Sequence, residues 1–190
     1  MESKSRSGLE FGALASVAES LQKEFVPKKN QWAGSRFKWA SVLSSGAKGK
    51  LGKRLVNSWC AGKGLAIGPS PDSEADSLLN GRRVEIKFSL LWRSGIYKFQ
   101  QIRDQNYEFL LCLGISPFEA HCWIVSKQQL KTHVIGKMGQ HTGRGGKETA
   151  WFSVRPEKPP NWLLGCGGSL DDALKILKRI KTKKGSKTKK

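Results

Sequence analysis

Acidic residues are scarce in this chain of 190 residues. Asp and Glu number 15 against 34 Lys and Arg, which leaves a formal net charge of +19 at pH 7. A balance of this kind predicts a polyanionic partner, either nucleic acid or an anionic membrane surface. The charge informs on the partner and not on the fold.

The sequence also lacks a long apolar run. No stretch approaches the ~20 apolar residues that span a bilayer, and no basic amphipathic helix with a strong apolar face dominates the pattern. The first ten residues, MESKSRSGLE, lack the apolar core of a signal peptide. We therefore expect a cytoplasmic protein with no membrane partner, which favours nucleic acid as the polyanion.

Cysteine is sparse, with four residues spread along the chain. Cys60, Cys112, Cys122 and Cys166 form no CxxC pair and have no histidine at zinc-ligand spacing. Cys112 and Cys122 stand in apolar runs, which predicts buried thiols. A metal role for the cysteines is disfavoured.

Apolar residues are frequent enough for one folded domain, because they make up 38% of the chain and include seven Trp and eight Phe. We expect this domain over residues 10–180, after a flexible basic N-terminus (1–9) and before a basic tail (181–190). The aromatic connector after residue 30 is expected to pack its Trp32, Phe37 and Trp39 on the domain.

Hydrophobic periodicity and turn signals predict the order of elements. The expected helices cover residues 13–25, 49–61 and 97–105, with a last helix capped by Ser169, and the expected strands are 65–67, the two arms of a hairpin around Asn80-Gly81, 109–115 and 121–126. The core order is thus helix, strand, two-stranded hairpin, helix, strand, strand.

The hairpin carries the chemistry. An Asn-Gly pair between alternating arms predicts a two-residue turn, and this register places Asp76 directly opposite Glu85. Period two puts Lys87 on the same face. Opposed carboxylates repel each other, whereas a divalent cation between them reverses that interaction. Oxygen ligands of this kind suit Mg²⁺, and the lysine can hold a water or screen charge on a phosphate.

A Glu-x-Lys triplet alone is weak evidence, because a sequence of this composition produces one by chance, and for the triplet alone a solvated strand face is the favoured interpretation. The register that opposes Asp76 to Glu85, the apolar alternates Val84, Ile86 and Phe88, and the order of the elements together favour a nuclease.

Asp76 with Glu85-Ile86-Lys87 on this scaffold resembles the PD-(D/E)XK nuclease superfamily. The runs VEIKFSLLW, YKFQQIRDQNYEFLLCLGISPF and GQHTG resemble bacterial type II restriction endonucleases over roughly residues 36–177. The resemblance implies an α/β fold with a single αβββαβ core, a mixed sheet flanked by helices. It also implies Mg²⁺-dependent cleavage of double-stranded DNA by a homodimer in the bacterial cytoplasm, with a companion DNA methyltransferase.

By position, the resemblance makes Asp76, Glu85 and Lys87 catalytic. It makes Asp76, Glu85 and the Ile86 carbonyl metal ligands. The literal Pro71-Asp72 is interpreted as a decoy, since Asp72 would face Ser89. Glu74, opposed to Lys87, is the secondary acid and a potential partner of that lysine.

The sequence departs from the superfamily pattern in the helix before the hairpin. Many members offer a glutamate there, whereas this chain has Lys50 and Lys53. The departure implies weaker metal binding at a second position, a one-metal mechanism or an inactive relative.

Candidate DNA contacts lie in two segments. Gln101 and Arg103 are placed on the helix expected at 97–105, and Gln140, His141 and Arg144 are in the Gly-rich loop after Gly136. A polar helix face and a solvated loop are the competing interpretations. The alternatives to a restriction enzyme are a structure-selective junction or repair nuclease and a non-catalytic basic DNA-binding protein.

Overall fold

The protein is described by a computed structural model that covers residues 3–25, 30–139 and 149–180. It divides into two compact units, Met1–Ala33 and Gly34–Lys190, and each is described by itself. The first unit contains α1 (Ser3–Phe25). The helix predicted at 13–25 is confirmed, but it begins earlier, so residues 3–9 are helical where the sequence predicts a flexible stretch. The domain limits of 10–180 stay a prediction.

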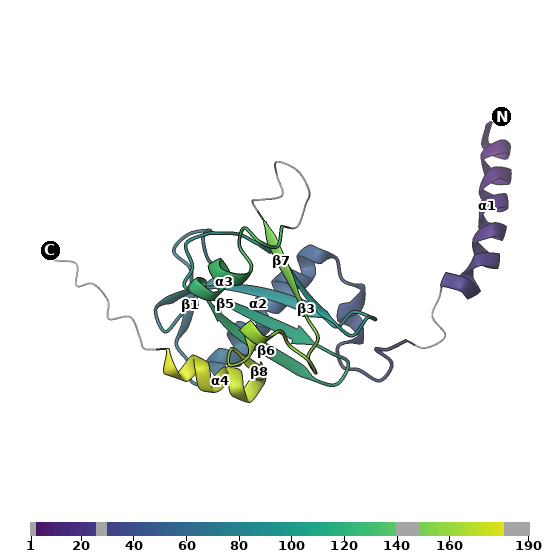
Figure 1. Cartoon of the computed structure of the whole chain (residues 1–190). Helices are drawn as coiled ribbons and strands as arrows, with labels where there is room; N and C mark the ends of the chain where they lie inside the picture. Colours follow the sequence, from purple (N-terminus) through teal and green to yellow (C-terminus); the bar gives the residue numbers. More distant parts are fainter. Residues whose placement is uncertain (1–2, 26–29, 140–148, 181–190) are drawn as a thin grey trace. The chain divides into compact units, whose positions relative to one another are not determined.

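The second unit is built on a six-stranded mixed sheet, whose central strands run side by side in Figure 1. Its strands, in spatial order, are β1 (Ile67–Pro69), β2 (Ser77–Leu79), β3 (Arg82–Leu90), β5 (Phe109–Ile115), β6 (Ala120–Ser126) and β8 (Gly167–Ser169). Only β3 and β5 are parallel neighbours, and the other pairs are antiparallel. The predicted mixed sheet is therefore present.

The helix predicted at 97–105 is wrong. Residues 97–102 form β4 (Tyr97–Ile102), which pairs with β7 (Ala150–Val154) in a separate two-stranded sheet. Tyr97 and Phe99 are buried and alternate with polar residues, as expected of a strand. A bulge between Phe99 and Ile102 interrupts this alternation, and the resulting spacing of apolar residues also fits a helix. The αβββαβ core is thus not formed in the expected way, because a strand replaces its second helix.

The helices of this unit have clear end signals. In the described part of this unit they are α2 (Ser45–Gly62), α3 (Lys127–His133) and α4 (Leu170–Arg179), together with the 3-10 helices η1 (Lys38–Val42) and η3 (Asn161–Leu163). Ser44, Ser126 and Ser169 cap the three α-helices with their side chains. The helices predicted at 49–61 and after Ser169 are confirmed.

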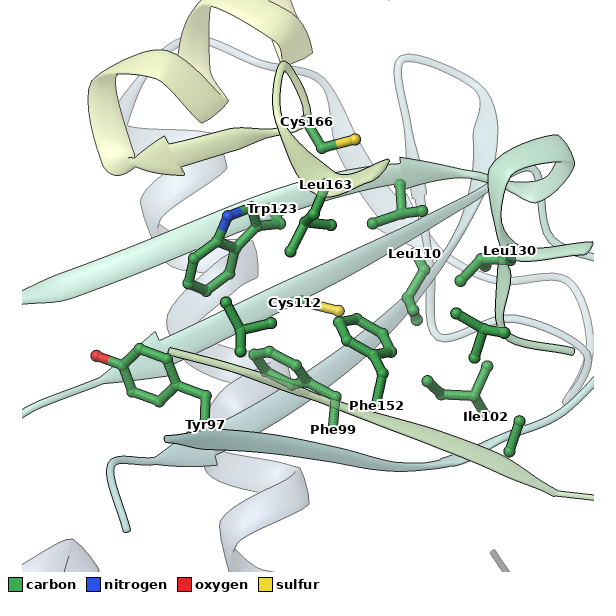
Figure 2. Packing of buried hydrophobic residues seen from close by; sticks show 14 of the residues in the cluster. Tyr97, Phe99, Ile102, Leu110, Cys112, Trp123, Leu130, Phe152, Leu163 and Cys166 are labelled. Carbon is green, nitrogen blue, oxygen red and sulfur yellow. The ribbon is translucent and has the colours of Figure 1, made fainter. Parts of the chain in front are cut away.

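Aromatic side chains fill the space between the six-stranded sheet and the β4–β7 pair (Figure 2). The rings of Tyr97 and Phe99 lie edge-on to Trp123, with centroids 5.9 and 6.2 Å away, and Phe99 lies 5.4 Å from Phe152. Such pairs contribute about 0.5–1.5 kcal/mol each beyond area burial. Gly114 permits the approach, because a Cβ there would lie 2.8 Å from the Tyr97 ring.

The opposite face of the sheet is covered by helices. α2 packs on β3, where a Cβ at Gly52 would lie 2.2 Å from the Cβ of Phe88. α4 packs on β6 and β8. The apolar alternates of β3, which are Val84, Ile86 and Phe88, therefore face α2.

Two smaller expectations have different outcomes. Cys112 and Cys122 are buried thiols, as predicted, and Cys60 and Cys166 are free and buried as well. Trp39, expected to pack on the domain, is instead 55% exposed, because it lies on the short helix η1 and turns outward. Within the described segments, no helix has the length and apolar character needed to cross a membrane.

Candidate active site

The predicted hairpin is present with the predicted turn. Asn80 and Gly81 have φ angles of 50° and 72°, the left-handed pair that a type I′ turn requires. Ser77 pairs with Val84, and the two strands stay in that register up to the turn. The Asn80 side chain also fixes the turn, because its Oδ1 accepts a hydrogen bond from Ala66 N at 3.2 Å.

The pairing ends at Ser77, one residue before the predicted opposition of Asp76 and Glu85. The Asp76 N–H donates to the carbonyl of Val84 at 2.9 Å, so the ladder slips by one residue. The Asp76 carboxylate replaces the lost ladder bond, because its Oδ2 accepts from Ile86 N at 2.9 Å. The predicted backbone opposition is therefore wrong, yet the side chain is fixed beside β3 by a hydrogen bond.

Glu85 and Lys87 lie on the sheet face that the β4–β7 pair covers. Their parallel partners on β5 are Leu110 and Cys112, both in the aromatic core, and register partners share a face. Lys87 Nζ lies 2.8 Å from Glu85 Oε1, and the two side chains are only 19% and 13% exposed. The strand thus holds a shielded ion pair at the sheet centre.

Glu85 interacts with both of its charged neighbours. Burial raises the pKa of Glu85 above its ordinary value, the ion pair with Lys87 opposes that rise, and the charge of Asp76 and a side-chain hydrogen bond with Asp76 add to it. The side chains of Asp76, Glu85 and Lys87 are therefore brought together as predicted.

Lys53 is a fourth member of the cluster. It projects from α2 and places Nζ 3.5 Å from Asp76 Oδ1. One turn further along α2, Asn57 Oδ1 accepts from the Ser77 hydroxyl at 3.1 Å. Their i, i+4 spacing puts both on one helix face, a signal that could have placed α2 against the hairpin edge. A lysine thus stands where the superfamily pattern suggests an acid.

A groove of about 670 Å³ opens beside this cluster. Its walls include Lys53 and Asn57 from α2, Ser70 from the turn after β1, and Asp76. The Ser70 hydroxyl is buried, with no hydrogen-bond partner in the described part of the chain. The groove gives Asp76 a route to solvent.

Two neighbouring acids lie away from the position that register predicted. Glu74 does not oppose Lys87, because its Oε2 accepts from Asn106 N at 3.1 Å. Asp72 does not face Ser89 and instead forms an ion pair with Arg83. The hydrogen bond from Arg83 lowers the pKa of Asp72. Both differences arise because the chain turns away from the ladder before Ser77.

The predicted DNA contacts are only partly described. Gln101 and Arg103 are exposed at the end of β4, on a strand and its exit instead of a helix. Gln140, His141 and Arg144 lie outside the described residues. The two described histidines serve packing, since His121 stacks on Trp123 and His133 stacks on Trp162.

The donor set fits Mg²⁺, which proteins bind with one or two carboxylates completed by waters and substrate phosphates. The candidate oxygen donors belong to Asp76, Glu85 and the Ile86 carbonyl. Asp76 Oδ1 lies 3.5 Å from Lys53 Nζ, and Asp76 Oδ2 accepts a hydrogen bond from Ile86 N. Among the described residues, no three or more His, Cys, Asp or Glu side chains gather in a group that could hold a metal ion.

Comparisons with known proteins do not assign this chain to a family. No model of a known protein family matches the chain, and no curated protein matches it. Among solved structures, the chain is similar to the bacterial homing endonuclease I-Ssp6803I, with a TM-score of 0.46 and 14% identity over 72% of this chain and 93% of that one. Since a TM-score below one half does not define a common fold, function is argued from the geometry of the site.

Proposed function

We propose that this protein is a divalent-metal-dependent DNA endonuclease with a PD-(D/E)XK-type site. The observation that carries the proposal is the cluster of Asp76, Glu85 and Lys87, in which a buried carboxyl group contacts both a second carboxylate and a lysine. Two carboxylates this close repel each other unless cations offset their charge. Lys87 and Lys53 offset it here, and a site built for a cation and a phosphate gives a reason for the arrangement.

In this mechanism, the carboxylates bind the metal ion and the lysine stabilises charge on the phosphate. Asp76, Glu85 and the Ile86 carbonyl would hold Mg²⁺, which polarises the phosphodiester and lowers the pKa of a bound water. Lys87 lies beside Glu85 and directs its positive charge at the negative charge that builds on the phosphate oxygens. The aromatic core behind Glu85 and Lys87 excludes water and strengthens that interaction.

The substrate proposed is duplex DNA, which the net charge of +19 attracts through its phosphates. A restriction-type enzyme would act as a homodimer, because two copies of the site cut two strands, and would be accompanied by a methyltransferase that protects host DNA.

A second function is favoured by Lys53. A lysine at 3.5 Å from Asp76 already neutralises one of the proposed ligands, and this contact suits a basic DNA-binding protein that has lost catalysis. The two functions differ in a single property, cleavage in the presence of Mg²⁺.

The test is incubation of the protein with supercoiled plasmid and with branched DNA in Mg²⁺. Discrete plasmid fragments would support a restriction enzyme, and cleavage confined to branched DNA would support a structure-selective nuclease. Retardation of DNA without cutting would support the binding protein and contradict the proposed nuclease.

The decisive variant is Lys87→Ala, with Lys63→Ala as its matched control on an exposed lysine at the end of α2. Lys87→Ala should slow cleavage by about 10²- to 10⁴-fold while DNA retardation changes little. Lys63→Ala should cut like the wild type. Undiminished cleavage by Lys87→Ala would remove the proposed site.

A further inference from the structure

The two-stranded sheet of β4 and β7 has one buried face and one outer face. Cross-strand partners share a face. Phe99 pairs with Phe152 in the core, and Lys98 pairs with Ser153 on the other side. We call that other side, together with the tryptophan that precedes it, the outer ribbon face; its residues are Trp92, Lys98, Gln100, Trp151, Ser153 and Arg155.

We propose that the outer ribbon face binds duplex DNA by lying in the major groove. The choice of DNA rests on the proposed function, whereas the surface lies outside the cluster of Asp76, Glu85 and Lys87. The shape is suitable, because the major groove of B-DNA, about 12 Å wide, admits a two-stranded β-ribbon.

Aromatic rings hold the central cation of this face in place. Lys98 Nζ lies 4.4 Å from the centroid of the Trp151 ring and 5.3 Å from that of Trp92. Trp92 is itself 50% exposed. A large exposed aromatic beside a fixed cation is typical of binding surfaces, since the rings restrict the lysine before a partner arrives.

The charge of the face complements a phosphate backbone. Lys98 and Arg155 are its charged residues, and none of the six residues is an acid. The guanidinium of Arg155 is positioned by donating to the Ser94 carbonyl at 3.2 Å. Phosphate contacts of this kind fix a protein on the duplex without reading sequence.

The bulge in β4 adds amide groups for base edges. The register shifts between Phe99 and Ile102, and Gln101 has a φ of 55°. Gln100 and Gln101 are therefore both exposed, although neighbours on a regular strand point to opposite sides. Strained backbone of this kind gathers at functional sites, and glutamine side chains pair with adenine in the major groove.

Binding of a labelled mixed-sequence DNA duplex, measured by fluorescence anisotropy in EDTA, tests the surface without any contribution from metal or cleavage. Ser153→Glu places a carboxylate in the centre of the face, directly across the strand pair from Lys98. Arg155→Glu reverses a cation at its edge. Lys63→Glu is the control for charge, because Lys63 ends α2, which packs across the sheet from the ribbon.

Each ribbon variant should weaken binding at least about tenfold, and Arg155→Glu should lower the slope of log affinity against log salt by about one. Lys63→Glu should weaken binding less than about threefold, and all variants should unfold at the wild-type temperature. Equal losses in the ribbon variants and in Lys63→Glu would overturn the proposal.

The groove is identified by methylation interference. Methyl groups on guanine N7, in the major groove, should block binding, whereas those on adenine N3, in the minor groove, should not. Duplex RNA should compete poorly, because its major groove is too narrow for a ribbon. Interference confined to adenine N3, or equal competition by RNA, would overturn the assignment.

These results separate the two proposals. If the ribbon variants lose binding and the wild type does not cut in Mg²⁺, the ribbon proposal stands and the nuclease falls. If the wild type cuts and the ribbon variants bind like Lys63→Glu, the nuclease stands and the ribbon proposal falls.

Discussion

The two faces of β3 show how one strand divides structure from chemistry. The face toward α2 carries Val84, Ile86 and Phe88, and it packs so closely that Gly52 has no room for a side chain. The face toward the β4–β7 pair carries Glu85 and Lys87 in an ion pair at the edge of an aromatic core. Successive side chains of β3 thus alternate between an apolar contact with α2 and a charged cluster on the opposite face.

This contrast indicates that packing on the apolar face of β3 stabilises the strand enough to offset the cost of the buried charges on its polar face. A shielded carboxyl group with a raised pKa destabilises a fold, so it is retained only where neighbouring residues hold the strand firmly. The α2 face supplies that support. Variants on the two faces should therefore separate stability from chemistry.

The largest effect is expected from the α2 face. Ile86→Ala removes a buried side chain and should lower the free energy of unfolding by about 2–5 kcal/mol, measured by urea denaturation. Val42→Ala is the control, because Val42 is 85% exposed and should change stability by less than about 0.5 kcal/mol. Similar losses in both would contradict the assigned packing.

Two glycines of α2 sharpen the same point. A methyl group at Gly52 would meet Phe88, so Gly52→Ala should destabilise by about 1–3 kcal/mol. A methyl group at Gly49 would have no other atom within 4 Å, so Gly49→Ala should stabilise by about 0.5–1 kcal/mol through helix propensity. The unfolding temperatures of the two variants should shift in opposite directions. A shift in the same direction would contradict the packing of α2 on β3 described above.

At the charged cluster, which Lys53 reaches from α2, Lys53→Glu should strengthen metal binding. The change removes the cation beside Asp76 and adds an oxygen ligand, and the number of charged ligands sets the affinity of such sites. We expect Mg²⁺ to bind about tenfold more tightly by calorimetry, equivalent to about 1.4 kcal/mol. Lys63→Glu makes the same charge change away from the site. An equal gain in Mg²⁺ affinity in that variant would show that net charge, and not an added ligand, causes the effect.

The smallest effect concerns the pH dependence of stability. Because the pKa of Glu85 is raised by burial, the folded protein keeps this proton to higher pH than the unfolded chain does. The contribution of Glu85 to stability is therefore present below its unfolded pKa and is lost as pH rises through the raised folded value.

Glu85→Gln removes this dependence. In EDTA, the unfolding temperature of the variant relative to the wild type should rise as pH increases through that window. Glu157→Gln, an exposed control, should show no such trend. A difference between Glu85→Gln and the wild type that does not change with pH would argue against the raised pKa.

Local signals in the sequence predicted the hairpin and the capped helix well. Asn80-Gly81 and Ser169 act through backbone geometry within a few residues, so their effect does not depend on the rest of the fold. The same reasoning failed for β4, because its partner β7 is distant in sequence and the bulge at Gln101 disguises the strand pattern.

The sequence predicted which charged side chains come together and not how the backbone holds them. Alternation placed Glu85 and Lys87 on one face, which the structure also has. The slip of the ladder at Asp76, just before Ser77, depends on the turn that carries Asp72 and Glu74 to Arg83 and Asn106. No pattern within the hairpin contains that information, so the contact of Asp76 with Ile86 N could not be derived from it.

The parallel β3–β5 pair has a consequence for how the protein is made. Its connection runs through β4, and β4 finds its hydrogen-bonding partner only in β7, far later in the chain. During synthesis, Glu85 and Lys87 emerge from the ribosome long before the strand that completes their cover. A truncated product that ends before residue 150 would therefore present these charges without the enclosure in which they are proposed to act.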